Sequence, residues 1–268
     1  MKFRFDHDYH IHSHLSLCSN DPEQNNESIL QYAKDEGLKE IVLTDHFWDE
    51  KIPKAPDWYK KQNFDHIKQA LPLPQDKDVR FLFGAETEFN RAHTVATARE
   101  TFDELDFVII PTTHLHMRGL TITEEDYDAE DDTRSRLWIS RMDALLSLDL
   151  PFRKIGIAHL ACPLFDKRSR GHYLKALDHI PTVEMERVFA KAAEVGVGIE
   201  LNRGDMSFKD DEADTVLRMF RVAKSCGCKF YCGTDAHHPK AFVNARDVFE
   251  RAIDLLGLTE NDKFHIGE

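Results

Sequence analysis

Several features are missing from this sequence, and each absence excludes a class of protein. No uninterrupted apolar stretch reaches the roughly 18 residues of a membrane-spanning helix, and the first residues lack the apolar core of a secretory signal. The 5 cysteines form no CxxC pair, which fits a reducing cytoplasm better than a disulfide framework. Lysine and arginine number 35 against 48 acidic residues, and the net charge of −13 argues against long nucleic acid as a partner.

Histidine, by contrast, is abundant. The chain has 15 histidines, whereas a usage of roughly 2% would give a chain of this length about six. With 268 residues, 41% of them hydrophobic and 31% charged, the composition is that of a globular protein. We expect residues 1–268 to form a single domain. An acidic, histidine-rich domain points to metal chemistry.

Short apolar runs alternate with longer segments whose apolar residues recur at helical spacing. The expected strands are residues 3–9, 40–44, 79–83, 107–110, 154–158, 197–201 and 229–232. The expected helices are residues 26–36, 63–70, 94–104, 134–148, 182–195, 211–226 and 241–256. Residues 48–64 and 121–133 are expected to be longer loops that serve as lids or face the substrate. Seven strand–helix units, with no glycine-rich phosphate loop after the first strand, favour an α/β barrel over an open sheet.

Each expected strand ends in a residue that can ligate a metal or support a ligand. Any single histidine in such a place is more often an ordinary hydrogen-bonded loop residue, but the recurrence on successive strands favours a joint site. The C-terminal ends of the strands form the active face of an α/β barrel, and side chains alternate along each strand. The side chains that can converge on one mouth are therefore His10, His12, His46, Glu86, His114, His159, Asp235 and His237.

The residue types of this set limit the choice of metal. Imidazoles and carboxylates without thiolate suit zinc, manganese or iron better than magnesium or calcium, which prefer oxygen ligands. The set exceeds the roughly four or five ligands of one ion and suits about two or three divalent ions. Asp45 is expected to orient His46, and Glu200 and Asn202 to support the ligands from behind.

As an ordered set over seven strands, these residues resemble the polymerase-and-histidinol-phosphatase (PHP) superfamily of metal-dependent phosphoesterases. The motifs that carry the resemblance are Asp8-Tyr9-His10-Ile11-His12, Thr44-Asp45-His46, Gly84-Ala85-Glu86, His114, His159 and Thr234-Asp235-Ala236-His237. The resemblance implies a distorted (β/α)7 TIM-like barrel with a trinuclear site. It also implies hydrolysis of a phosphate ester, most closely that of the histidinol-phosphatase-like members.

The resemblance implies three sets of ligands. His10, His12, Glu86 and Asp235 hold one ion. Glu86 bridges to a second ion that His114 and His159 also hold. His46 and His237 hold the third.

One stretch departs from the family pattern. In the family, an Asp or His seven or eight residues after the HxH pair ligates the third ion, whereas here the stretch reads Leu17-Cys18-Ser19-Asn20-Asp21. We expect Asp21 to reach the ion from a longer loop, with Cys18 as the alternative.

The reaction expected on this basis is an in-line attack on phosphorus by a metal-activated hydroxide. Glu86, Asp235 and His237 are the expected catalytic residues. Arg118 and Arg203 are candidates to clamp the phosphoryl oxygens, since arginine matches phosphate bidentately. His116 is a further substrate-binding candidate. The expected partner is a small-molecule phosphomonoester, with no membrane involved and the oligomeric state left open.

Three other functions fit parts of the pattern. A metal-dependent amidohydrolase also places HxH after its first strand, but it typically needs a bridging lysine after the fourth, and the segment 107–114 has none. A phosphodiesterase or nuclease of the same superfamily is a second alternative. A barrel that binds metal only for stability is the third.

Overall fold

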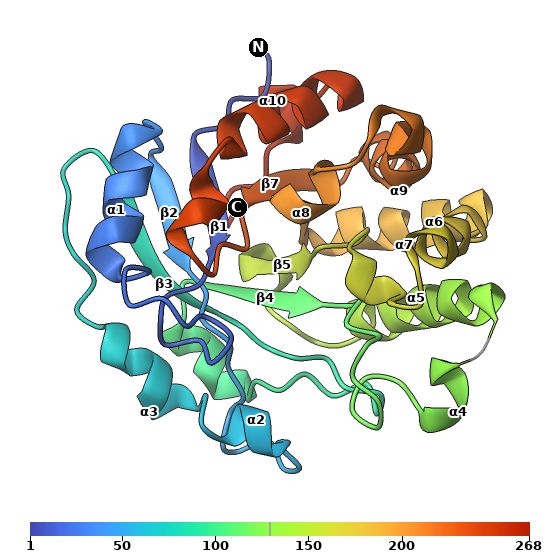
Figure 1. Ribbon diagram of the computed structural model, residues 1–268, viewed down its shortest axis with the longest axis horizontal. Coiled ribbons are helices and arrows are strands. Elements are labelled where there is room, and N and C mark those ends of the chain that lie inside the picture. The colour runs from blue at the N-terminus through green and yellow to red at the C-terminus, as the bar shows by residue number, and fades with distance from the viewer. Residues whose placement is uncertain (129) are drawn as a thin grey trace.

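The computed structural model describes residues 1–128 and 130–268 (Figure 1). Its centre is a sheet of seven parallel strands that lie in the order in which they follow along the chain. The strands are β1 (His7–Ile11), β2 (Glu40–Leu43), β3 (Arg80–Glu86), β4 (Phe107–Pro111), β5 (Ile155–Ala158), β6 (Gly198–Asn202) and β7 (Lys229–Gly233).

The first and last strands meet, so the sheet curls into a nearly closed barrel. His12 N–H donates to the Ala236 carbonyl at 3.0 Å, and Asp235 N–H donates to the His10 carbonyl at 2.7 Å. These bonds join the carboxyl ends of β1 and β7, where the predicted ligands stand. The predicted (β/α)7 TIM-like barrel is confirmed.

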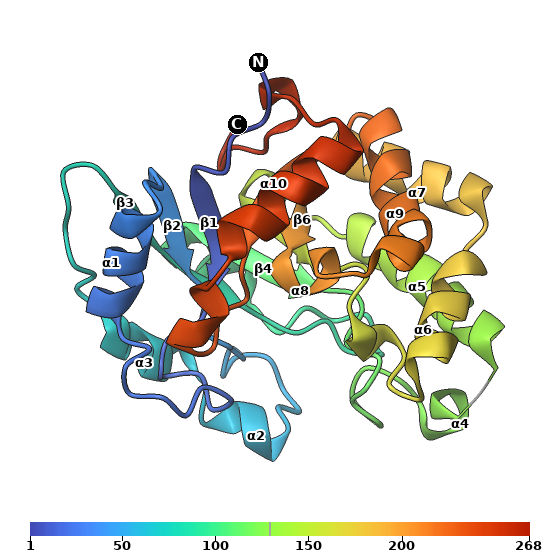
Figure 2. The same cartoon turned by 45° about the horizontal axis from the view of Figure 1, so that its top comes forward.

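The helices surround the barrel. They are α1 (Asn26–Asp35), α2 (Asp57–Lys60), α3 (Phe64–Ile67), α4 (Glu124–Tyr127), α5 (Asp131–Leu146), α6 (Arg170–Asp178), α7 (Thr182–Val195), α8 (Arg203–Met206), α9 (Ala213–Ser225) and α10 (Ala245–Leu256). Figure 2 shows α5, α7 and α9 side by side on the outside of the sheet, where α7 packs against both others. No helix within the described ranges is long and apolar enough to cross a membrane.

Six of the seven expected helices agree with the structure, and one does not. The helix expected at 182–195 is confirmed as α7, whereas the one expected at 94–104 is wrong: only Arg99–Glu104 is helical, as a 3₁₀ turn. The sequence prediction also missed α6, whose N-terminus is capped by the Ser169 hydroxyl. The expected loops at 48–64 and 121–133 contain the short helices α2 and α4, and residue 129 of the second loop lies outside the described residues.

The strands are buried on both faces, as parallel strands covered by helices usually are. Along β2, Val42 belongs to a small cluster with Phe107 and Tyr231, while Ile41 and Leu43 belong to the main core. A bulge in β1 shifts the pairing register between Asp8 and Ile11. Because a bulge re-aims the side chains that follow it, this irregularity lies where the first metal-ligand candidates leave the strand.

Candidate metal centre

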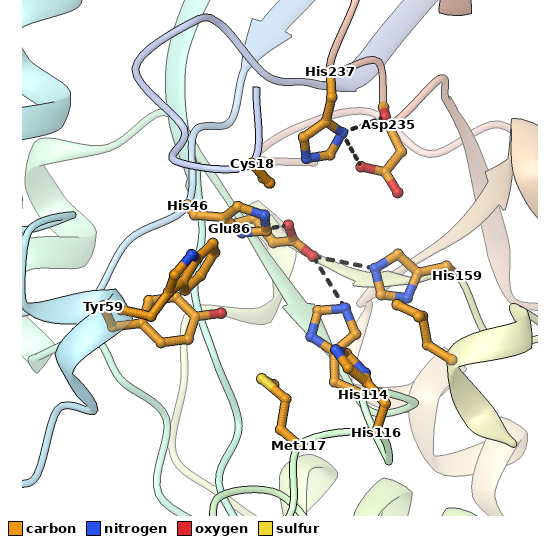
Figure 3. A pocket seen from close by; sticks show the side chains of 12 residues that line it. Cys18, His46, Tyr59, Glu86, His114, His116, Met117, His159, Asp235 and His237 are labelled. Atoms are coloured by element: carbon orange, nitrogen blue, oxygen red, sulfur yellow. Dashed lines mark hydrogen bonds and ion pairs between the residues drawn. The ribbon is translucent and has the colours of Figure 1, made fainter. Parts of the chain in front are cut away.

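The ends of the strands enclose a cavity of about 240 Å³ (Figure 3). Histidines that follow several strands point into it together with the carboxylates of Glu86 and Asp235. The lining residues are Cys18, His46, Trp58, Tyr59, Glu86, His114, His116, Met117, His159, Leu164, Asp235 and His237.

The first group of possible ligands consists of His10, His12, Glu86 and Asp235. The Nε2 atoms of His10 and His12 lie 3.0 Å apart. Asp235 Oδ1 lies 3.3 Å from His10 Nε2 and 3.2 Å from His12 Nε2. Glu86 Oε2 lies 3.6 and 3.4 Å from the same two nitrogens. Four donor atoms therefore converge on one point.

Hydrogen bonds behind His10 and His12 set the tautomer of each ring. His10 Nδ1 lies 2.7 Å from Glu200 Oε1, and since a carboxylate accepts, this nitrogen carries the proton. The Ser16 hydroxyl donates to Asp45 Oδ1 at 2.6 Å and therefore accepts from His12 Nδ1 at 3.0 Å. Both Nε2 atoms are consequently left with lone pairs that face each other. A cation between them removes this repulsion, so the residues present fit a metal ion.

The second group consists of Glu86, His114 and His159. Glu86 Oε1 lies 3.1 Å from His159 Nε2 and 3.9 Å from His114 Nε2. His114 Nδ1 donates to Glu88 Oε2 at 2.9 Å. Thr113 Oγ1 donates to the His159 carbonyl and so accepts from His159 Nδ1 at 3.2 Å. Because one oxygen of Glu86 faces this group and the other faces the first, Glu86 has the geometry of a bridging ligand.

The third group contains only imidazoles, from His12, His46 and His237. The rings of His12 and His237 stack at 4.0 Å between centroids. His237 Nδ1 donates to the Asp235 carbonyl at 2.9 Å. His46 Nδ1 is buried and, within the described residues, makes no hydrogen bond, although Glu86 Oε2 lies 3.0 Å away. His46 and His237 can offer lone pairs to an ion here, whereas the lone pair of His12 Nε2 already faces the first group, and this group has no carboxylate of its own.

The electrostatics of the site favour cations. Burial by itself opposes ionisation of Glu86, but the imidazoles of His46 and His10 outweigh it and hold the pKa of this carboxyl well below its usual range. Burial likewise opposes ionisation of Asp235, and His10 and His12 lower its pKa. Burial lowers the pKa of His237 to about 3, so this imidazole is neutral at pH 7. Burial opposes a charge on His10 and His12, but Asp235 outweighs it and raises the pKa of both rings, so a metal ion would take the place of a proton there.

Two ligand candidates have a left-handed backbone, His159 with φ 31° and Asp235 with φ 54°. This conformation is uncommon for residues other than glycine and costs about 1–3 kcal/mol. Hydrogen bonds hold both residues in place: His159 N–H donates to Glu200 Oε2 at 2.7 Å, and Asp235 N–H donates to the His10 carbonyl. The backbone is thus constrained where the donor atoms converge.

The structure brings together all the predicted ligands except Asp21. The Asp21 carboxylate lies 2.8 Å from His238 Nε2 and does not line the cavity. Cys18, from the same loop, does line it. Burial and the negative charge of Glu86 raise the pKa of the Cys18 thiol to about 12, so the sulfur is protonated unless a cation lies beside it.

Of the three substrate-binding candidates, only His116 lines the cavity. Arg118 donates to the Asp128 carboxylate at 3.2 Å and lies over the Tyr127 ring, while Arg203 donates to the Val243 carbonyl at 3.0 Å. No lysine or arginine of the described chain is among the lining residues. Neither predicted arginine clamp is therefore in contact with the cavity.

Several supporting residues were missed or misplaced by sequence reasoning. Glu88 holds His114, and its position two residues after Glu86 on an alternating strand was a usable signal. No pattern in the sequence singles out Ser16, since it reaches His12 through a turn. Asp45 was expected to orient His46, but its carboxylate instead accepts from Ser13 and Ser16. Asp45 thus acts on His12 through the Ser16 hydroxyl.

Comparisons with known proteins agree with this geometry. The sequence profile of the PHP domain matches residues 8–204. A search of curated proteins found no match. Among solved structures, the chain is similar to the histidinol phosphate phosphatase of Lactococcus lactis subsp. lactis Il1403, solved with zinc, L-histidinol and phosphate. The identity is 16%, the match covers 97% of this chain and 98% of that one, and the TM-score is 0.59.

A second solved structure is a dihydropteroate synthase of Coxiella burnetii in complex with pteroic acid. It is 13% identical, the match covers 93% of each chain, and the TM-score is 0.42, which is too low to support an argument. The similarity to the histidinol phosphate phosphatase, at 16% identity, shows a shared fold.

Proposed function

The chain belongs to the PHP domain family, and from this premise we propose that it is a metal-dependent phosphatase acting on a small phosphomonoester, as histidinol phosphate phosphatase does. The observation that carries the proposal is the convergence of the His10 and His12 lone pairs, 3.0 Å apart, with the carboxylates of Glu86 and Asp235. Such a set of donor atoms needs a cation, and in this family the cations serve phosphate-ester hydrolysis.

The proposed site is trinuclear and follows the three groups of donors. His10, His12, Glu86 and Asp235 would hold one ion, Glu86, His114 and His159 a second, and His46 and His237, beside His12, a third. Zinc, manganese and iron all suit imidazole–carboxylate ligands. When bound, such ions polarise a phosphoryl oxygen and lower the pKa of a coordinated water.

Three residues of the chain would position the reacting groups. Glu86 faces two groups with its two oxygens and fixes their separation. The Asp235 side chain is 30% exposed and ionised, so it can accept a hydrogen bond from a water molecule in the cavity and orient it. His237 is neutral, with Nδ1 held by the Asp235 carbonyl, so its Nε2 is available to the cavity.

The residues that line the cavity favour a substrate whose leaving group is small and carries no negative charge of its own. Trp58, Met117 and Leu164 contribute apolar side chains to the lining, which also contains His116. With no lysine or arginine among the lining residues of the described chain, the charge of the phosphoryl group would be balanced by the ions. A volume of about 240 Å³ lies just below the roughly 300–1,000 Å³ of typical small-molecule sites and leaves little room for a polymer inside the cavity.

Metal analysis combined with a substrate panel tests the proposal. The purified protein should contain transition metal and hydrolyse a generic aryl phosphate, and Glu86→Gln and His159→Ala should abolish turnover while the chain stays folded. His265→Ala is the matched control, because this histidine is exposed and lies near Lys229, at the opposite end of β7 from the site. Normal turnover in His159→Ala, or activity on amides or lactones but on no phosphate ester, contradicts the proposal.

A further inference from the structure

We propose that Cys18 binds the third ion as a thiolate, beside His46 and His237. The inference rests on the proposed metal centre and deepens it, since it assigns a ligand that neither the family motifs nor the expected Asp21 supply. It also makes this position of the site selective for metals that prefer sulfur.

The third group lacks a negatively charged ligand of its own. Its members are three imidazoles, and His46 Nδ1 is buried without a hydrogen bond inside the described part of the chain. His46 is 8% exposed, and both it and His237 line the cavity. Cys18 is not a member of this group, but it lines the same cavity, and Figure 3 shows it on the side of His46 and His237.

The loop that carries Cys18 is attached on both sides of the sulfur. Leu17 N–H donates to Gln62 Oε1 at 3.0 Å, and the Ser19 hydroxyl donates to the carbonyl of His237 at 2.7 Å. The second bond ties the loop to the backbone of a ligand residue. The two bonds hold Cys18 at the wall of the cavity that His46 and His237 also line, and the thiol would reach the ion by a rotation of its side chain.

The other candidates for this position are engaged elsewhere. The Asp21 carboxylate pairs with His238 at 2.8 Å. Cys162 Sγ lies 3.7 Å from Nδ1 of His159, the nitrogen on the side away from Glu86. Cys226 donates to the carbonyl of Glu186, on the outer helix α7.

The binding step is balanced by the release of one proton. The Cys18 S–H bond breaks, its proton goes to solvent, and the sulfur lone pair forms the bond to the cation, with no change of oxidation state. The Cys18 thiolate, the imidazoles of His46 and His237 and a water would make four ligands, the tetrahedral number for zinc, whose usual ligands are thiolate and imidazole. Cobalt(II) can replace zinc in such a site as a spectroscopic probe. Manganese and magnesium, which prefer oxygen ligands, are disfavoured at this position.

Cobalt(II) titration of the metal-free full chain tests the proposal without an activity assay. The wild-type protein should develop the near-ultraviolet sulfur-to-cobalt charge-transfer band. Cys18→Ser and Cys18→Ala should lose this band and bind the weakest cobalt ion at least about tenfold less tightly, given that even residues behind a ligand affect affinity by 10- to 100-fold. Asp21→Asn and the outer-helix control Cys226→Ser should keep the band.

The outcomes are distinct. Cobalt uptake without the band in wild type, or a band that survives in Cys18→Ser, overturns the thiolate ligand and leaves the rest of the centre intact. Loss of an ion in Asp21→Asn but not in Cys18→Ser would show that Asp21 is the ligand at this position, and would also overturn the proposal for Cys18. A protein that takes up no cobalt at all refutes the whole centre, and with it the proposed function. Because Cys18 lies on a loop and belongs to none of the hydrophobic clusters of the described chain, its replacement should leave the fold, checked by circular dichroism, unchanged.

Discussion

Glu200 offers a sharp test of how the protein fixes the protonated nitrogen of His10. The substitution Glu200→Gln replaces one carboxylate oxygen by an NH₂ group, and its effect can be worked out from the contacts. The Glu200 carboxylate is fully buried, and both oxygens accept hydrogen bonds. Oε1 accepts from His10 Nδ1 at 2.7 Å, and Oε2 accepts from His159 N–H at 2.7 Å and from the Asn202 amide at 3.2 Å. In Glu200→Gln the shape is kept, but one oxygen becomes an NH₂ group that can only donate.

The replacement therefore brings two donors together wherever the NH₂ group is placed. Facing His159 N–H, it leaves a buried donor without a partner, which costs about 1–3 kcal/mol. If the NH₂ group faces His10, either the Nδ1 proton of His10 loses its acceptor, or the proton moves from Nδ1 to Nε2. In the second case the Nε2 lone pair is no longer available to a metal ion. We expect the affinity for the ion at His10 to fall about 10- to 100-fold, as is usual when a group behind a ligand is lost.

Competition with a metal chelator measures the affinity, and thermal unfolding of the metal-free protein measures the stability. Glu100→Gln is the control, since Glu100 is an exposed glutamate paired with Lys51 at 3.0 Å. The control should change neither quantity appreciably. If Glu200→Gln binds zinc and unfolds as the wild type does, the assignment of the His10 tautomer, and the argument for a cation that depends on it, is wrong.

Three further predictions concern the same region. Gly233→Ala would place a methyl group against Glu200 Oε1 and 2.6 Å from His10 Cβ, so we expect lower stability and weaker zinc binding, measured by calorimetry; an unchanged affinity would contradict the close packing. Burial raises the pKa of Asp205 from 3.8 to about 7, so the folded state holds this proton more tightly and loses stability as pH rises from about 4 to 7. Asp205→Asn should remove that loss, a gain on the order of 4 kcal/mol above pH 7 in denaturant unfolding of the metal-free protein, and a gain equal at pH 4 and pH 8 would refute the cause. Chelation should lower the unfolding temperature, and added zinc should restore it. At a zinc concentration 1,000 times Kd, binding should stabilise the folded state by roughly 4 kcal/mol. Identical unfolding temperatures with and without chelator would argue against a bound ion.

Sequence patterns predicted the barrel because they depend on local rules. Strands that alternate with helices must pair in parallel, and the carboxyl ends of parallel strands must meet. His10 and Glu86 lie near the carboxyl ends of their strands, and His46 and Asp235 follow theirs within three residues, so their convergence needed no knowledge of the long loops. The mispredicted helix at 94–104 shows the limit of such rules, since helical spacing of apolar residues was outweighed there by tertiary contacts.

Residues on long loops were less predictable. Arg118 stands only a few residues after His114, yet its guanidinium lies against Tyr127 and Asp128 and not in the cavity. Asp21 and Cys18 are three positions apart, and only the second lines the site. Sequence distance from a motif does not determine the direction of a side chain once the chain has left the strand.

The sequence by itself determined the barrel, the end of the barrel that carries the site and most of the residues that meet there. Short apolar runs, helical spacing and the residues at strand ends are all properties of neighbouring residues. Only the tertiary structure decided which nitrogen of each histidine is free and which residue of the first loop lines the cavity. These properties depend on contacts between distant parts of the chain, such as His10 with Glu200 and Ser19 with His237. A hydrogen bond of that kind depends on where two separate backbones are placed by the whole packed core, and no local pattern contains that position.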